Sequence, residues 1–209
     1  MRRIVFVLTA AALLFGAPRA EAMEGIEITV SPGYTIPIWG YAGTARDETA
    51  GGLSFTVRGY LGSMMVGEYE FDYGFEAGYF PLYSWEYTWD YGIWGEETYK
   101  SSYSVMPFLG QVRYRFGEPG DDSYFYGMSG LGFYHWRWKY ENSFPVYNYM
   151  TGQYVTEEDS GTATSTTLGL TAGVGYKAQL GDNLHGDVML RWTGAYSVIN
   201  LHFGLGMLF

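Results

Sequence analysis

The sequence predicts an all-β chain whose strands close into an eight-stranded antiparallel, up-and-down barrel that spans a membrane. Over most of its 209 residues, apolar and polar side chains alternate with a period of two, the period of a strand with two different faces. Long polar connections and tight turns follow one another between these stretches, as they do in a membrane barrel. After the first residues, no segment holds the roughly 18 consecutive apolar residues of a helical span.

The first residues are expected to be an export signal. Two arginines precede a short apolar run, and residues 20–22 have the small-x-small form of a cleavage site. We therefore predict a signal peptide over residues 1–22 and one mature barrel domain over residues 23–209.

Composition narrows the classes of function. The chain has 12 basic and 22 acidic residues, so its overall field is not expected to attract nucleic acid. Aromatic residues make up 20% and hydrophobic residues 47% of the chain, which suits strands with one face in lipid and one in a lumen. Cysteine is absent, and a closed barrel needs no disulfide because its strands already pair their backbone groups.

Eight stretches are predicted as strands from their alternation. The apolar positions of each are expected to face lipid, and the polar positions the lumen. Pro32 and Pro37 each remove a ladder donor from the first strand, so a bend is expected near one of them. The predicted strands are residues 26–38, 53–61, 68–79, 102–117, 124–139, 167–180, 184–193 and 199–209.

The strand at residues 124–139 has the least regular alternation. If Tyr126 and Trp136 face outward, Leu131 and Phe133 are left facing the lumen. This phase places Trp136 in the outer girdle of aromatic residues at the membrane surface.

The connections alternate between long and short, which predicts extracellular loops on one side and periplasmic turns on the other. Residues 40–52 are expected to form a loop, and residues 141–165 a loop or ribbon. Between them, the alternation continues past Pro81, and a straight strand from residue 68 to 93 would measure about 85 Å, far more than a bilayer. This segment is therefore expected to bend at Pro81 and project as a ribbon, or to form a separate extracellular hairpin.

The last eleven residues are predicted to form the closing strand. From residue 199 to 209 all six odd positions are apolar, whereas four of the five even positions are Asn, His or Gly. At about 3.3 Å per residue the stretch is about 35 Å long, enough to cross a bilayer at a tilt. The ending resembles that of bacterial outer-membrane barrels, whose assembly machinery reads a terminal Phe with apolar residues two, four and six places before it. The matching residues are Phe203, Leu205, Met207 and Phe209.

The pattern as a whole resembles the eight-stranded barrels of the OmpX, OmpA and OmpW type. The resemblance implies a small monomer in the outer membrane of a Gram-negative bacterium, in contact with lipid and lipopolysaccharide and inserted by the barrel-assembly machinery. It also implies a role in adhesion, in membrane integrity or in the passage of small molecules.

The first candidate site is a set of nine charged residues predicted to face the lumen. An eight-stranded barrel is just wide enough for its side chains to fill it, and stripping one partner from a buried ion pair costs about 3–5 kcal/mol. We interpret the set as a structural plug of ion pairs, and the alternative is a gated pore whose pairs exchange partners. The residues are Arg58, Glu70, Asp72, Glu76, Arg113, Arg115, Lys177, Asp187 and Arg191.

The second candidate site is an aromatic and acidic stretch outside the barrel. Rigid rings beside carboxylates suit a glycan or the surface of a host protein, because they bury area with little loss of rotamer freedom. The alternative is a ribbon whose rings pair across its strands and only stabilise it. The rings are Tyr83, Trp85, Tyr87, Trp89, Tyr91 and Trp94.

Catalysis is not expected, and neither a cofactor nor a metal site is predicted. The nearest approach to a catalytic group is His135 with Glu141 and Ser143. His185 and His202 lie on the last two strands, but a histidine in a polar lumen is more often a hydrogen-bonding filler.

The sequence thus predicts an outer-membrane barrel with a structural or surface-interaction role of the adhesin type. A porin-like pore for ions or small solutes is the first alternative, and a lipid-modifying enzyme is the second. An exported soluble barrel of the lipocalin type would show the same alternation with the faces exchanged, apolar inside and charged outside.

Overall fold

The computed structural model describes residues 26–38, 49–67, 69–117, 121–194 and 197–209. The predicted signal peptide and most of the predicted loop at residues 40–52 lie outside the described residues. Among the described residues there is no helix with the length and apolarity that a membrane span requires.

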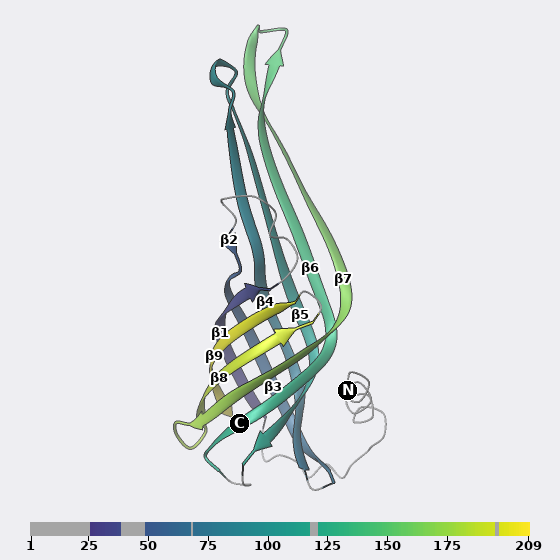
Figure 1. Cartoon of the computed structure of the whole chain (residues 1–209), viewed down its shortest axis with the longest axis vertical. Coiled ribbons are helices and arrows are strands. Elements are labelled where there is room, and N and C mark those ends of the chain that lie inside the picture. The colour runs from purple at the N-terminus through teal and green to yellow at the C-terminus, as the bar shows by residue number, and fades with distance from the viewer. Residues whose placement is uncertain (1–25, 39–48, 68, 118–120, 195–196) are drawn as a thin grey trace.

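Strands make up nearly all of the described chain. Eight of them form a closed antiparallel ring in the order β1-β3-β4-β5-β6-β7-β8-β9, and β9 pairs back to β1 (Figure 1). The short β2 is added to β4 beyond the ring. The predicted fold class, an eight-stranded antiparallel barrel, is confirmed. The elements are β1 Glu27–Pro37, β2 Thr49–Ala50, β3 Gly52–Val66, β4 Tyr69–Asp90, η1 Gly92–Trp94, β5 Glu96–Phe116, β6 Ser123–Asn148, β7 Gln153–Gln179, β8 Leu184–Thr193 and β9 Val198–Leu208.

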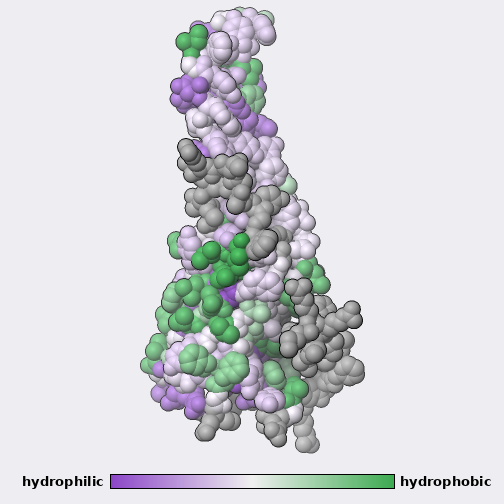
Figure 2. Space-filling model, viewed as in Figure 1, coloured by the Kyte–Doolittle hydropathy of each residue, from purple (hydrophilic) through white to green (hydrophobic). Residues whose placement is uncertain are grey.

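The two faces of the strands differ as a membrane barrel requires. On β1, the apolar residues Val30 and Ile36 are exposed, whereas the polar residues Thr29 and Ser31, on either side of Val30, are buried. Exposed apolar residues and buried residues alternate in the same way on β9. Figure 2 shows hydrophobic residues gathered over the barrel half of the molecule, below the projecting part. A closed cylinder with an apolar outside and buried charges inside is stable in lipid, because every strand has a paired neighbour on both edges.

The predicted phase was wrong for β6. Tyr126 and Tyr134 are 0% exposed and face inward, whereas Phe125 and Phe133 are 65% and 59% exposed and face outward. Rings stand at consecutive positions here, so the apolar pattern does not separate the faces. The phenol hydroxyl does, because it can hydrogen-bond in the polar lumen while Phe cannot.

Trp136 shares the inward phase of β6. It packs against a cluster on the inner side that contains Leu82 and Val105. The expected place of Trp136 in the outer girdle is therefore wrong.

A β-bulge at Leu82 changes the face on which the odd positions of β4 lie. Pro81 pairs with Ser104 and Tyr83 pairs with Tyr103, which leaves Leu82 as the extra residue. Before the bulge, Tyr79 is exposed on the outer face, and after it Tyr83 packs against the inner cluster. Because β4 runs on to Asp90, the segment is a projecting ribbon and not a separate hairpin.

Four strands continue far beyond the barrel wall. β6 and β7 have 26 and 27 residues, against 10 and 11 for β8 and β9. At about 3.3 Å per residue, this difference carries them about 50 Å past the shorter strands. β5 stays paired to β6 as far as Thr98 and Ser143, so β4, β5, β6 and β7 form one four-stranded sheet, which we call the extracellular sheet (Figure 1). Of the two alternatives for residues 141–165, the ribbon is the one observed.

The inner face of β9 has no room for a side chain at Gly206. A Cβ atom at Gly206 would collide with His185 Nε2 and Thr29 Oγ1, which enter the lumen from β8 and β1. We expect Gly206→Val to lower the free energy of unfolding by about 1–3 kcal/mol, since it overfills a packed interior. Urea unfolding of protein refolded into phospholipid vesicles measures this. Leu205→Val on the lipid face is the control, and equal stability of the two variants would contradict the prediction.

Candidate functional site

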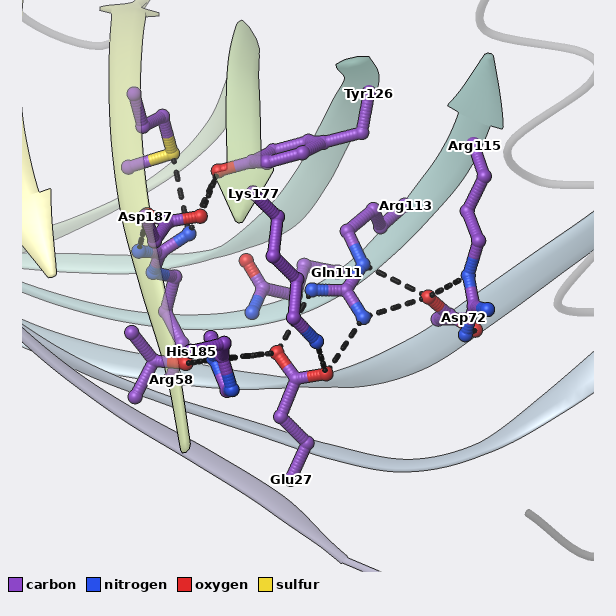
Figure 3. Close-up of polar contacts among 12 residues, drawn as sticks. Glu27, Arg58, Asp72, Gln111, Arg113, Arg115, Tyr126, Lys177, His185 and Asp187 are labelled. Atoms are coloured by element: carbon purple, nitrogen blue, oxygen red, sulfur yellow. Dashed lines mark hydrogen bonds and ion pairs between the residues drawn. The ribbon is translucent and has the colours of Figure 1, made fainter. Parts of the chain in front are cut away.

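Glu27 is the centre of an ion network near the short-turn end of the lumen. Arg113 donates from Nη1 and Nη2 to the two carboxylate oxygens of Glu27, at 2.8 and 2.9 Å. Lys177 Nζ donates to Glu27 Oε2 at 2.6 Å, and His185 Nε2 lies 3.3 Å from Oε1. Figure 3 shows the carboxylate enclosed by these groups from β5, β7 and β8. Glu27 is 1% exposed, so its charge is balanced by contacts within the protein.

Arg113 joins this carboxylate to a second one on β4. Its Nε donates to Asp72 Oδ2 at 2.8 Å, and its guanidinium lies 3.8 Å from the ring centroid of Tyr60. Arg115 donates to both oxygens of Asp72, at 3.1 and 2.8 Å. The guanidinium of Arg113 thus donates to two carboxylates at once, which requires a planar group with several donors.

A second group lies in the middle of the lumen around Asp187 on β8. Arg58 forms an ion pair with Asp187 and donates to Ser31 Oγ at 2.8 Å. Tyr126 donates its hydroxyl hydrogen to Asp187 Oδ2 at 2.6 Å. Both Arg58 and Asp187 are buried, so this group ties β3 to β6 and β8 across the barrel.

The third group lies toward the extracellular end of the lumen. Arg191 pairs with Glu76, and its guanidinium lies 4.8 Å from the ring centroid of Phe80. An apolar cluster, which we call the apolar seal, begins level with this pair at Leu109, the cross-strand partner of Glu76, and continues outward along the strands. It consists of Leu82, Val105, Leu109, Tyr134 and Val198.

The structure brings eight of the nine predicted lumen charges into these three groups. Glu70 is not among them: it is half-buried, pairs with Met65 across the β3–β4 ladder, and forms no ion pair among the described residues. Glu27 and Tyr126 were missed. Glu27 shares the phase of Thr29, so its inward position was readable from the sequence, whereas Tyr126 was lost with the wrong phase of β6.

The histidines are engaged in structural contacts. His185 lies against Glu27 and 3.0 Å from Thr29 Oγ1, and His202 Nδ1 is 3.2 Å from the backbone oxygen of Ser31. In the part of the chain that the structure describes, no three His, Asp or Glu side chains are placed to hold a metal ion.

The grouping of His135 with Glu141 and Ser143 is not assembled either. His135 contacts Thr166 Oγ1 at 3.0 Å. Glu141 stands six positions farther along the same strand, about 20 Å away at strand rise. It pairs instead with Lys139, whose hydrogen bond holds the pKa of the Glu141 carboxyl below its usual value.

The extracellular sheet has one aromatic face. Cross-strand partners share a face, so the register places the predicted rings of β4 beside rings of β5 and β6. Trp85 stacks on Tyr103 at 5.5 Å, and Tyr103 on Trp138 at 6.0 Å between ring centroids. Tyr140 lies next, 5.2 Å from Trp138 and 6.5 Å from Tyr99. The members of this aromatic face are Tyr83, Trp85, Tyr87, Trp89, Tyr99, Tyr103, Trp136, Trp138, Tyr140 and Phe144.

Apart from the paired rings of Tyr147 and Tyr154 near the tip, the other face of the sheet is polar. The aromatic face continues the inner face of the barrel. Val105, in the apolar seal, is the cross-strand partner of Trp136. On the polar face, Glu86 pairs with Lys100 at 3.0 Å, and Lys139 pairs with Glu141. Each of these charged residues is next in sequence to a residue of the aromatic face and therefore points to the other side, so the sheet is amphipathic.

Tyr91 and Trp94 lie at the tip and not in the strand face. They line a cavity of about 440 Å³ with Glu97, Asn142, Phe144, Pro145 and Tyr154. Tyr91 donates its hydroxyl hydrogen to Glu97 Oε2 at 2.9 Å, and this hydrogen bond raises the pKa of Tyr91.

Removing Glu27 is expected to destabilise the barrel more than removing any exposed acid. Glu27→Ala leaves Lys177 and His185 without their carboxylate, and a stripped buried partner costs about 3–5 kcal/mol. Unfolding in phospholipid vesicles gives the change in free energy. Glu70→Ala is the matched control and should change stability by less than about 0.5 kcal/mol. Equal effects of the two substitutions would show that the network does not hold the barrel.

Comparisons with known proteins gave similarities to solved structures alone. No family model and no curated protein matches the sequence. Among solved structures, the N-terminal barrel of Pseudomonas aeruginosa OprF is similar at 14% identity and TM-score 0.42, covering 90% of this chain and all of that one. Neisserial surface protein A (11% identity, TM-score 0.49) and the attachment invasion locus protein Ail of Yersinia pestis (14%, 0.40) each cover 89% of this chain and 98% of their own. At these identities, the similarities say nothing about what the chain binds. By its own closed ring, apolar exterior and charged lumen, the chain is a small eight-stranded outer-membrane β-barrel.

Proposed function

We propose that the chain is a surface-interaction protein of the outer membrane that binds a partner through the aromatic face of its extracellular sheet. The observation that carries the proposal is that the rings of three strands lie together on one side of a sheet that stands in water. The barrel then serves as the anchor that holds this sheet upright.

An aromatic surface of this size is costly to expose without a use. Trp85, Tyr87, Tyr103 and Trp138 are only half-buried, and Trp89 is exposed. Soluble surfaces rarely carry a large contiguous apolar patch unless it binds something. Rings also suit recognition because they bury much area for little loss of conformational freedom.

Stabilisation of the ribbon alone is the competing explanation for these rings. Stacked pairs such as Trp85 and Tyr103 do hold neighbouring strands together. That purpose, however, does not require the rings to share one face, because cross-strand pairs stabilise a ribbon equally from either side. The one-sided arrangement favours a surface for a partner.

The binding test compares the two faces at adjacent positions. We expect Trp85→Ala combined with Trp138→Ala to weaken adhesion of cells displaying the protein by at least about tenfold, since buried Trp residues dominate interface energies. The probes are a glycan array and immobilised extracellular-matrix proteins. Glu86→Ala combined with Lys139→Ala, one residue along each strand on the polar face, is the control and should leave adhesion unchanged. Equal loss in both variants, or no binding by the wild type above cells without the protein, would refute the proposal.

A narrow pore is the second candidate, and one observation favours it. Arg191 Nε, Arg191 Nη2 and Glu76 Oε2 are buried without a hydrogen-bond partner among the described residues, so this pair has unused bonding capacity for exchanging partners. Against it, most of the apolar seal lies outside the pair, and the Glu27 and Asp187 groups fill the lumen beneath.

Planar-bilayer recording separates the anchor from the pore. The refolded wild-type protein is expected to give no discrete conductance steps, because ions would have to pass three paired groups and the apolar seal. Steps that change in size with Arg191→Ala or Arg113→Ala would instead establish a conducting lumen. A detergent extract without the protein controls for steps from impurities.

A further inference from the structure

One long edge of the extracellular sheet has no neighbouring strand. β7 pairs with β6 along its whole length, but with β8 only from Thr171 to Gln179. At Leu170 the backbone oxygen still accepts a hydrogen bond from Gly194 N, at 2.9 Å. From Gln153 to Gly169, therefore, no described residue pairs with the outer side of β7, which Figure 1 shows as the outermost strand of the projecting sheet. At about 3.3 Å per residue this free edge is about 55 Å long.

The part of the free edge nearest the barrel, residues 160–169, lacks the features that normally prevent strand addition. Proteins protect edge strands with charges, prolines, bulges or very short lengths. Residues 160–169 contain no charge and no proline, and six of the first eight are Ser or Thr. The ladder to β6 runs through this stretch without a register shift, and its residues are exposed except for Gly161 and Gly169, which are half-buried. β-branched residues in a strand with an unbroken register favour further pairing.

Geometry argues against a second copy of this chain as the occupant. Two copies in one membrane would bring their β7 edges together in parallel, and a parallel ladder joins residues one position out of step. A two-fold axis normal to the membrane holds both barrels at the same depth and places each residue level with the same residue of the other copy. It therefore cannot supply the offset of about 3.3 Å that the ladder needs. A copy on an opposing membrane would arrive tip first, and a shallow overlap of the two tips would set its acidic run Glu157-Glu158-Asp159 against the same run here.

We propose that the free edge of β7 is a strand-addition site for an extended segment of a different protein. Main-chain hydrogen bonds to residues 160–169 would supply the affinity. Glu157, Glu158 and Asp159 continue the edge toward the tip, so the segment should carry basic residues where it passes them. This site is separate from the aromatic face, and either of the two can fail without the other.

The test selects peptides and then blocks the edge. Peptides of about ten residues, the upper length of an ordinary strand, are selected from a random display library on wild-type protein in lipid nanodiscs. We expect the selected sequences to lack proline and to be rich in β-branched and basic residues. Thr164→Lys combined with Thr166→Lys should weaken their binding by at least about tenfold, because charges on an edge oppose pairing. Ser102→Lys combined with Ser104→Lys places the same charges on the same face of the interior strand β5 and should leave binding unchanged.

Amide hydrogen exchange locates the bound peptide. Successive residues of a strand direct their N–H groups to opposite sides, so binding should slow exchange at alternate residues between 160 and 169. The proposal is overturned if no peptide is retained above empty nanodiscs, if both lysine variants lose binding equally, or if the slowed amides lie elsewhere. It is also overturned if Thr164→Cys cross-links the protein to itself in nanodiscs that hold two copies, since the edge would then take a second chain of the same kind.

Discussion

Closure of the ring by β1 and β9 is the constraint on which the rest of the molecule depends. Ile26 and Phe209 exchange two backbone hydrogen bonds, at 3.1 and 3.0 Å, and the β1–β9 ladder continues to Pro37 and Val198. In hydrocarbon an unpaired N–H or C=O group costs several kcal/mol, so a membrane sheet must leave no edge. Once closed, eight strands enclose a space that side chains fill, and the charges that point into it have to find partners there.

The extracellular sheet inherits its two faces from that barrel. Inside the membrane, the inner face is polar because it meets other polar side chains, and the outer face is apolar because it meets lipid. Beyond the membrane both faces meet water, yet the side that continues the lumen carries the rings, from Val105 and Trp136 outward. The bulge at Leu82 makes this so on β4, since it moves the aromatic odd positions from the lipid side to the inner side.

Much of the fold was predictable because most strands alternate cleanly. β1 and β9 show the expected phase, and Arg58, Asp72 and Asp187 face inward as their positions indicated. β6 failed because rings stand side by side at Tyr124, Phe125 and Tyr126, where only the hydroxyl distinguishes inside from outside. A single inserted residue such as Leu82 has no signature of its own in an apolar run.

The candidate sites were less predictable than the fold because they depend on register. That Glu27 points inward follows from its phase, but its meeting with Arg113 and Lys177 depends on the curvature of the whole ring. Likewise, the rings of β4 were recognisable as a group, whereas their stacking with Tyr103 and Trp138 follows from pairings that alternation does not specify.

The position of Glu27 couples assembly of the barrel to neutralisation of its interior. Glu27 stands on β1, at the seam, while Arg113, Lys177 and His185 come from β5, β7 and β8. A sheet that has formed every hairpin but has not yet joined its first strand to its last holds these cations without their shared anion, so it remains hydrated and charged. Completion of the seam therefore also dries the lumen, and a half-inserted intermediate stays distinguishable from the finished barrel by its open, cationic interior.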